Sequence, residues 1–305
     1  MSSAEWNPII RRCALHERAS ILGAIGAALT GTPNVTHESS RTNELRVWHD
    51  AAHKQFVTDA RKFRKTDFLA LHNVQYSYSI ARGDGQKLDP AYLKEVLLLQ
   101  LSNEVHDRVR TGWSMFYPFT RDEIPPHFIV DESSGEGDED FIECALLRDT
   151  SDLGFYADMW RISTGGKATL IRPYWEDKED WNRSIERQPG SWLSPALQIR
   201  SLSELLRHAQ AFAEKFDAPV SVTLTCEWRG LSGRTIFHPG RYYSVGGLAC
   251  TDQRRVTKEI PMASLANSWP EIVSDFLAPV IRLFNTSFKV TPDGVRSEAP
   301  DWLHL

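Results

Sequence analysis

The stretch DMWRISTGGKATLIRPY, residues 158–174, predicts a β-hairpin. Its two halves, 158–163 and 167–174, are rich in residues that favour strands, and Thr164-Gly165-Gly166 joins them. Paired glycines supply the positive φ angles that a tight hairpin turn requires. Further strands are predicted at 67–80, 141–147, 220–228, 234–237 and 254–260.

Helical periodicity surrounds these strands and sets the fold class. Between residues 43 and 64 the apolar side chains recur on one face, as in an amphipathic helix that packs against a core. Helices are predicted at 7–29, 43–64, 90–108, 202–216 and 269–284. Because no βαβ rhythm is present, we predict the α+β class: a helical N-terminal region, a mixed but largely antiparallel sheet body and a C-terminal helix. Residues 1–65 would form the helical region and 66–305 the body, as two units or as one continuous domain.

The composition is that of an ordinary globular protein rather than a disordered or collagen-like chain. Of 305 residues, 41% are hydrophobic, and 35 lysines and arginines face 40 acidic residues, for a net charge of −5. This near-neutral balance argues against a protein that coats nucleic acid with its whole surface. No run reaches the roughly 18–20 apolar residues that span a bilayer, so we expect no membrane association. Four scattered cysteines without CxxC spacing favour a reducing compartment, and we predict a cytoplasmic protein.

Two patterns could hold a metal ion. His49 and His53 lie at positions i and i+4 of a predicted helix, with Asp50 beside them, so both rings could share one ion. The alternative is a solvated helix face, because two histidines alone seldom make a metal site. Glu143 and Glu227 lie inside predicted strands and could serve a metal-dependent nuclease, although acids inside strands commonly form salt bridges.

Other catalytic motifs are missing from the sequence. It contains no Gly-x-Ser-x-Gly elbow, no phosphate-cradling glycine loop and no convincing pair of a cysteine with a histidine. The acids after the hairpin could bind a metal ion, but we expect them to form an exposed turn. These acids are Glu176, Asp177, Glu179 and Asp180. We therefore assign no catalytic residue and no cofactor from the sequence.

Two segments could contact nucleic acid. Residues 41–65 carry a local charge of +4, and a basic cluster at their end suits a phosphate backbone. The cluster consists of Arg61, Lys62, Arg64 and Lys65. A second patch would combine aromatic side chains with Arg229, Arg234 and Arg241. Similar patches occur on many proteins that bind no nucleic acid, so both interpretations stay open.

Several segments together resemble the C-terminal region of bacterial proteins that carry a Schlafen-type AlbA-2 domain. The segments are 141–147, 158–163, 166–172, 174–177, 227–234 and 269–284. The resemblance covers about 112–288, and it implies a bacterial protein from a defence or regulatory system that works with a partner. The AlbA-2 domain itself, with its glutamate–apolar–lysine signature, has no counterpart in this sequence, so no catalytic residue is carried over.

From these observations we predict a non-enzymatic accessory, sensor or adaptor protein that acts through a protein partner, with nucleic acid as a further ligand. The aromatic residues of 113–119 are expected to be exposed to that partner, although such side chains are more often part of a core. The first alternative is a metal-dependent nuclease or hydrolase, built on the two histidines or on the two strand acids. A DNA-binding regulator that uses residues 61–65 is the second. The sequence leaves catalytic activity undecided.

Overall fold

The computed structural model describes residues 40–64, 71–83, 85–109, 114–117, 127–129, 140–150, 154–178, 182, 185–238 and 243–299. Its helices are α2 (Ser40–Arg64), α4 (Pro90–Tyr92), the π-helical η1 (Leu93–Leu97), α5 (Leu98–Val109), the 3-10 turn η2 (Trp175–Asp177), α7 (Pro195–Ala213), α8 (Met262–Asn267), α9 (Trp269–Ile281), the 3-10 turn η4 (Arg282–Phe284) and α10 (Pro292–Glu298). Its strands are β1 (Asn73–Arg82), β2 (His127–Ile129), β3 (Phe141–Thr150), β4 (Gly154–Ser163), β5 (Lys167–Pro173), β6 (Trp192–Leu193), β7 (Pro219–Arg229), β8 (Thr235–His238), β9 (Tyr243–Val245) and β10 (Gln253–Pro261). The predicted helix at 7–29 lies outside the described residues.

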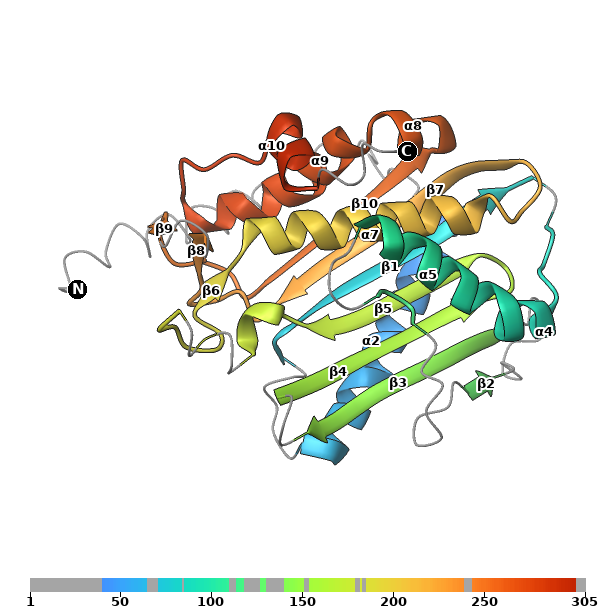
Figure 1. Cartoon of the computed structure of the whole chain (residues 1–305), viewed down its shortest axis with the longest axis horizontal. Coiled ribbons are helices and arrows are strands. Elements are labelled where there is room, and N and C mark those ends of the chain that lie inside the picture. Colours follow the sequence, from blue (N-terminus) through green and yellow to red (C-terminus); the bar gives the residue numbers. More distant parts are fainter. Residues whose placement is uncertain are drawn as a thin grey trace, which may run out of the picture.

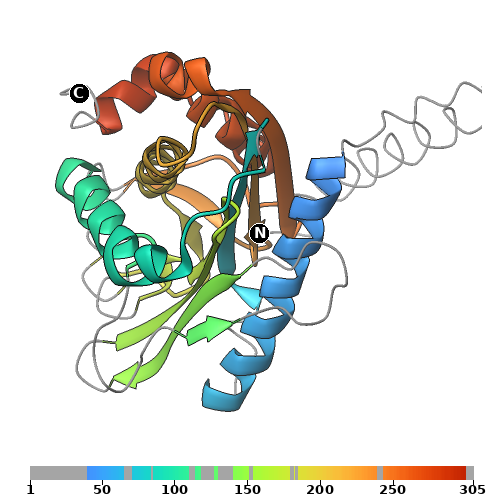
Figure 2. The ribbon, with the colours of Figure 1, turned by 90° about the vertical axis from the view of Figure 1, so that its right-hand side faces the viewer.

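Seven antiparallel strands form the main sheet in the order β10-β7-β1-β5-β4-β3-β2 (Figure 1). A smaller sheet has the order β6-β8-β9, and in it β6 pairs with β8 in parallel. Helix α2 crosses one face of the main sheet, whereas α5, α7 and α9 lie on the other side (Figure 2). This arrangement confirms the α+β class and the largely antiparallel sheet. None of the helices in the described part of the chain is long and apolar enough to cross a bilayer.

The predicted hairpin at 158–174 is confirmed as β4 and β5, with Ile162 opposite Ala168 next to the turn. Gly166 in this turn has a φ of +93°, which side-chain-bearing residues rarely adopt. A Cβ at this position would also lie 3.3 Å from the Cβ of Ile80 in β1. The backbone conformation therefore favours glycine here, and the close approach of β1 leaves little room for a side chain.

The alternation of residues along β1 gives the main sheet two different faces. Tyr76 and Tyr78 belong to the main apolar core, and the Tyr78 hydroxyl contacts His208 of α7. Gln75 and Ser77 point to the opposite side and form hydrogen bonds with residue 49 of α2. All four side chains are fully buried. The part of this face that β1 contributes is therefore polar although it is shielded from solvent, whereas the polar face of an antiparallel sheet is commonly solvated.

Helix α2 confirms the helix predicted at 43–64 and is anchored to the sheet by apolar contacts over its second half. Ala52, Phe56 and Ala60 of α2 form a cluster with Met159 of β4 and Ile171 of β5. The spacing of these helix residues is the i, i+4, i+8 pattern of a core-facing stripe. The described helical region and the sheet therefore share buried apolar surface.

Helix α7 begins earlier than the sequence predicted, at Pro195 instead of residue 202. The Ser194 side chain accepts a hydrogen bond from the backbone N–H of Leu197, and Pro195 occupies the first turn. A serine cap followed by proline is a common helix start, so Ser194-Pro195 is the local signal for this earlier beginning.

The expectation that the aromatic residues of 113–119 are exposed is wrong for Phe116. Phe116 is fully buried, and its ring stacks on His208 of α7 with a centroid distance of 4.3 Å. Tyr117 is half-buried, and its carbonyl oxygen accepts a hydrogen bond from Trp160. Trp113 and Phe119 lie outside the described residues.

Candidate functional site

A chain of hydrogen bonds runs across the polar sheet face beneath α2. The Nδ1 atom of His49, on α2, lies 2.8 Å from Oγ of Ser77 on β1. Its Nε2 atom lies 2.8 Å from Oε2 of Glu227 on β7. Thr169 on β5 extends the chain, because its hydroxyl contacts the Ser77 hydroxyl and lies 3.2 Å from the carbonyl oxygen of Tyr76. Residues far apart in the sequence thus form one network, which we call the α2 network.

Glu227 is the centre of the α2 network. Its carboxylate accepts hydrogen bonds from His49, Arg229, Arg255 and Gln253, and the Arg255 contact measures 2.8 Å. Burial alone would raise the pKa of Glu227, but the hydrogen bond from His49 and the charges of Arg229 and Arg255 outweigh burial and hold this pKa well below its usual value. The carboxylate therefore stays ionised at neutral pH.

The proton positions in the α2 network follow from the ionised carboxylate. Burial lowers the pKa of His49, although the hydrogen bond to Glu227 acts in the opposite direction, so the ring is neutral at neutral pH. A neutral imidazole has one N–H, and it must be on Nε2 because the carboxylate can only accept. Nδ1 then accepts the hydroxyl proton of Ser77. Ser77 in turn accepts a hydrogen bond from Thr169.

The α2 network contains a serine, a histidine and a glutamate, the side chains that nucleophilic hydrolases use for catalysis. Ser77, His49 and Glu227 are each fully buried. Ser77 lies in the middle of β1, between β5 and β7, with α2 above it. A nucleophile must reach within about 3–3.5 Å of its substrate, and this oxygen has no exposed surface for such an approach. In the described arrangement these side chains therefore hold α2 on the sheet, and Ser77 is not placed to attack a substrate.

Of the two histidines predicted as metal ligands, His49 belongs to the α2 network and His53 lies one helical turn further along α2. Both ring nitrogens of His49 form hydrogen bonds, so this ring has no free nitrogen for a metal ion. Burial, followed by the charge of Arg229, lowers the pKa of His53 to about 4. Among the described residues, no group of three or more histidines, cysteines or acids could hold a metal ion. The alternative of a solvated helix face is wrong for His49, which is fully buried.

The second predicted metal pair is separated by the sheet. Glu227 lies on β7 and Glu143 on β3, four strand positions apart in the sheet order. At a spacing of about 4.8 Å per strand, the two strands are roughly 19 Å apart. Glu143 forms an ion pair with Arg161 of the neighbouring strand. The prediction that these two acids form one site is wrong.

A second buried polar cluster lies where η2 meets β8. Asp177 forms a two-pronged ion pair with Arg234, with N–O distances of 2.8 and 2.6 Å, and both side chains are fully buried. The Arg234 guanidinium lies over the ring of Tyr174 at 4.3 Å from its centroid. Glu176 accepts the backbone N–H of Ser194 at 2.9 Å, and burial raises its pKa to about 7. These contacts join η2 to the beginning of α7 and to the small sheet.

This cluster corrects the prediction of an exposed acidic turn after the hairpin. Glu176 and Asp177 are only 1% and 5% exposed, because each carboxylate is directed inward to a hydrogen-bond donor. Glu179 and Asp180 lie outside the described residues. Local charge alone could not indicate burial, because the partner Arg234 lies 57 residues away in the chain.

Gly230 fixes the turn that brings Arg234 into this cluster, which allows a direct test. Its φ is +72°, and an added Cβ would lie 2.7 Å from Cγ of His72. Gly233 has a φ of +81°, but no atom lies within 4 Å of the equivalent Cβ position. We expect Gly233→Ala to lower the free energy of unfolding by about 1–2 kcal/mol through backbone strain alone. Gly230→Ala should lower it by at least about 1 kcal/mol more, because it adds a steric clash.

Urea denaturation of the parent chain and both glycine variants measures this difference. Equal losses of stability in the two variants would show that the close approach of Gly230 to His72 carries no cost.

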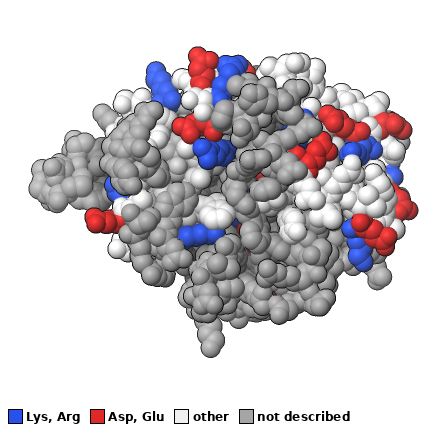
Figure 3. All heavy atoms as spheres, viewed as in Figure 1, with Lys and Arg blue, Asp and Glu red and all other residues white. Residues whose placement is uncertain are grey.

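Two of the predicted nucleic-acid contacts, Arg229 and Arg234, are buried in the described part of the chain. Arg229 and Arg234 are buried in ion pairs with Glu227 and Asp177, so neither forms the exposed patch that was expected. Arg61 is exposed on α2. Lys62 and Arg64 are the next basic residues of α2, but their side chains lie outside what the structure describes, as do Lys65 and Arg241. On the face shown in Figure 3, the described basic and acidic side chains are interspersed.

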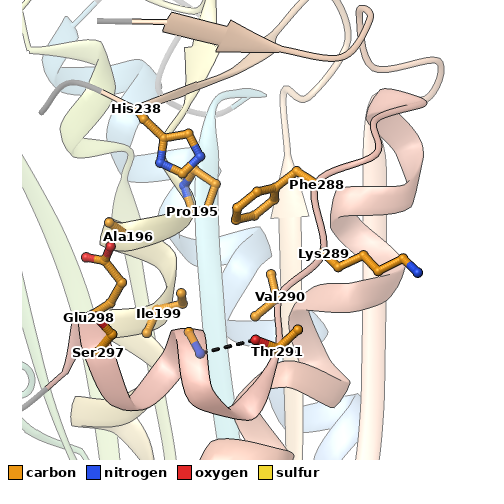
Figure 4. Close-up of a pocket in the computed structure, with 11 residues that line it drawn as sticks. Pro195, Ala196, Ile199, His238, Phe288, Lys289, Val290, Thr291, Ser297 and Glu298 are labelled. Atoms are coloured by element: carbon orange, nitrogen blue, oxygen red, sulfur yellow. Dashed lines mark hydrogen bonds between the residues drawn. The ribbon is translucent and has the colours of Figure 1, made fainter. Parts of the chain in front are cut away.

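A small pocket lies between the beginning of α7 and α10 (Figure 4). Its walls include the apolar side chains of Ile199, Phe288 and Val290. The ring of His238 meets Phe288 edge to face at 5.0 Å. The Thr291 hydroxyl, also in the wall, accepts the N–H of Gly294 at 3.1 Å and thereby caps α10. These contacts are typical of packing around a helix start, and they indicate no particular ligand.

No family model, curated protein or solved structure matches this chain. The resemblance to the C-terminal region of AlbA-2 proteins therefore stays a prediction. The α2 network and the exposed surfaces of the described residues are the observations that bear on function.

Proposed function

We propose that this chain is a non-enzymatic accessory, sensor or adaptor protein of a bacterial defence or regulatory system, acting in the cytoplasm through a protein partner. The observation that supports it best is a stripe of exposed apolar side chains on the helical segment made of α4, η1 and α5. We call it the helical stripe, and it consists of Tyr92, Val96 and Leu99.

The helical stripe has the spacing of a docking surface. Its three side chains are 42%, 49% and 41% exposed, in the order given, and they recur at positions i, i+4 and i+7. The same helical segment buries a different set of residues against the core, among them Leu93, Leu97 and Leu101. Apolar side chains in contiguous exposed groups mark interaction sites more often than single ones do. The segment thus has apolar side chains on two sides, and the described elements bury one of them.

The local geometry of this segment adds a second argument. Residues Leu93–Leu97 form a π-helical turn between the α-helical segments α4 and α5. Such turns are rare and often occur at functional sites. Val96 lies within this turn, and the charged side chains of Lys94 and Glu95 beside it are exposed. An apolar centre with a charged rim is the usual composition of a protein interface.

The partner best suited to this surface is the apolar face of an amphipathic helix or an apolar groove that receives a helix. The burial of Ser77 and His49 supports a binding function over a hydrolytic one, because no described nucleophile–base pair is open to solvent in the α2 network.

The test compares partner capture by two variants of tagged full-length chain from its native host. In the first variant, Tyr92→Ser, Val96→Ser and Leu99→Ser are combined. We expect the parent chain to retain a stoichiometric protein partner. The variant should bind this partner at least about tenfold more weakly, because a few anchor side chains contribute most of the binding energy of an interface. Quantitative mass spectrometry of the eluate identifies the partner, and titration of the purified components gives the affinities.

The matched control combines Val47→Ser with Val220→Ser, which removes exposed apolar side chains from α2 and β7. This control should retain the partner. A parent chain that elutes alone, or a partner that binds the stripe variant as tightly as the parent, would contradict the proposed function.

A further inference from the structure

The two edges of the main sheet differ in a way that bears on self-association. One edge is β2, of which the described residues are His127–Ile129. The other edge is β10, which spans nine residues, Gln253–Pro261, and pairs with β7 along its whole length. Within the described part of the chain, no backbone hydrogen bond joins the outer side of β10 to another element. Unpaired N–H and C=O groups in such a row are a template for a further strand.

The side chains of β10 leave this outer edge accessible. Thr257 and Glu259 are exposed and lie on the α2 side of the sheet, where they contact Thr225 and Ser221 of β7. On the other side, Lys258 forms an ion pair with Asp275 of α9, which covers that face. On both faces, side chains of β10 thus contact other elements of the same chain. The outer edge of β10 has no neighbouring strand among the described elements.

A second copy of the chain can pair with this edge in an antiparallel arrangement about a two-fold axis. Residues opposite each other in the two strands must then lie on the same face of the sheet. Because side chains alternate between the faces, the two-fold axis must pass through a residue and not between two residues. With the axis at Val256, Arg254 would face Lys258 of the other copy. With the axis at Arg255, Lys258 or Glu259, that charged residue would face its own copy. Like charges directly opposite each other destabilise a strand pair.

One central register avoids every one of these repulsions. With the axis at Thr257, the two threonines face each other and Arg255 of each copy lies opposite Glu259 of the other. Threonine pairs and opposite charges across neighbouring strands both stabilise a sheet. Arg255 contacts Glu227 and Asp50 through Nη2, and a guanidinium has five N–H donors, so the cross-strand contact requires no loss of these bonds.

We infer that the chain forms a symmetric dimer in which two β10 strands pair antiparallel about Thr257 and extend the main sheet across both copies. The charges on this edge, which would repel in the other registers, here select a single register. This interface is separate from the helical stripe, so the dimer leaves that surface free for a different protein.

The dimer is tested with purified full-length chain by sedimentation or light scattering over a range of concentrations. We expect the parent chain to have twice the mass of the monomer. Glu259→Lys places like charges opposite each other twice in the dimer and should raise its dissociation constant about tenfold. Glu214→Lys makes the same change of charge at the exposed end of α7 and should leave the dissociation constant unchanged. A monomeric parent chain, or a dimer that Glu259→Lys does not weaken, would overturn the inference.

A cross-linking experiment tests the register independently of charge. In the register centred on Thr257, a Thr257→Cys chain has its two introduced thiols directly opposite each other and should form a disulfide-linked dimer on mild oxidation. In a Glu259→Cys chain the thiols are offset by four residues, roughly 13 Å along the strands, which exceeds the reach of a disulfide. Both are made with Cys13→Ser and Cys250→Ser, because Cys250 is exposed and Cys13 lies outside the described residues. Cross-linking of the Glu259→Cys chain in preference to Thr257→Cys would show that the register is wrong.

Discussion

Replacing Glu227 by glutamine is expected to lower the free energy of unfolding by about 3–5 kcal/mol, the range found when one member of a buried ion pair is removed. Glutamine has nearly the same shape, so the change removes the charge and little packing volume. Arg229 would then remain buried without its counter-charge, and Arg255 would lose one of its two acidic partners. The amide would also have to match the donors of His49 and Gln253, both of which now bond to a carboxylate that only accepts.

Chemical denaturation at pH 7 measures this loss, provided that the slope of the unfolding free energy against denaturant is unchanged. Glu271→Gln is the matched control, because Glu271 forms an ion pair with Arg296 in which the two side chains are 49% and 38% exposed. Exposed ion pairs contribute about 0–1 kcal/mol, so the control should lose no more than that. A Glu227→Gln chain as stable as the control would show that the α2 network does not hold this part of the fold together.

Most of the secondary structure could be predicted from local patterns. The hairpin at 158–174 was predicted correctly because its turn requires glycine at Gly166, whose φ is positive. Helix α2 was predicted because its apolar residues recur with the helical period. In both cases the information lies within a single stretch of chain, where turn chemistry and periodicity act directly on the backbone.

The polar network could not be predicted, because its members come from distant segments. His49 and Glu227 are 178 residues apart in the chain. Alternating polar residues such as Gln75 and Ser77 normally indicate a solvated sheet face, and nothing in the strand itself shows that a helix covers that face. A usable signal was present in part: an acid inside a strand, followed two residues later by an arginine on the same face, is typical of a buried ion pair. Glu227 and Arg229 fit this description.

The α2 network and the apolar cluster of α2 have complementary effects on where the helix lies. The cluster around Phe56 buries apolar surface, and such contacts tolerate small shifts because they are not directional. His49 can bond to both Ser77 and Glu227 in only one position of the helix on the sheet. Directional bonds in a buried site penalise any other arrangement, since they would leave polar groups unpaired. The apolar cluster of α2 thus contributes stability, and we expect the α2 network to define the position of the helix on the sheet.

Acid is expected to destabilise the protein through a buried histidine on the opposite side of the sheet. His208 is buried between Tyr78, Phe116 and Phe212, and burial lowers its pKa to about 3. In the unfolded chain its pKa returns to about 6.5. Between these values the unfolded chain binds a proton that the folded chain does not, so stability falls as the pH decreases. From pH 6.5 to pH 4 this one group accounts for a loss of about 3 kcal/mol.

A comparison of variants isolates this contribution, because other groups titrate in the same range. The lowered pKa values of His49 and His53 act in the same direction, whereas the raised pKa of Glu176 contributes stability that is lost as the pH rises through about 7. His208→Gln cannot titrate and should lose about 3 kcal/mol less stability than the parent between pH 6.5 and pH 4, as measured by urea denaturation at each pH. Tyr78→Phe removes the hydrogen bond to the ring at 2.8 Å but keeps the histidine, so its stability should be lower at every pH and its pH dependence unchanged. If instead the His208→Gln chain lost as much stability as the parent between pH 6.5 and pH 4, His208 of the parent would have to bind its proton equally well in the folded and the unfolded state. Burial of His208 would then not control the acid stability of this fold.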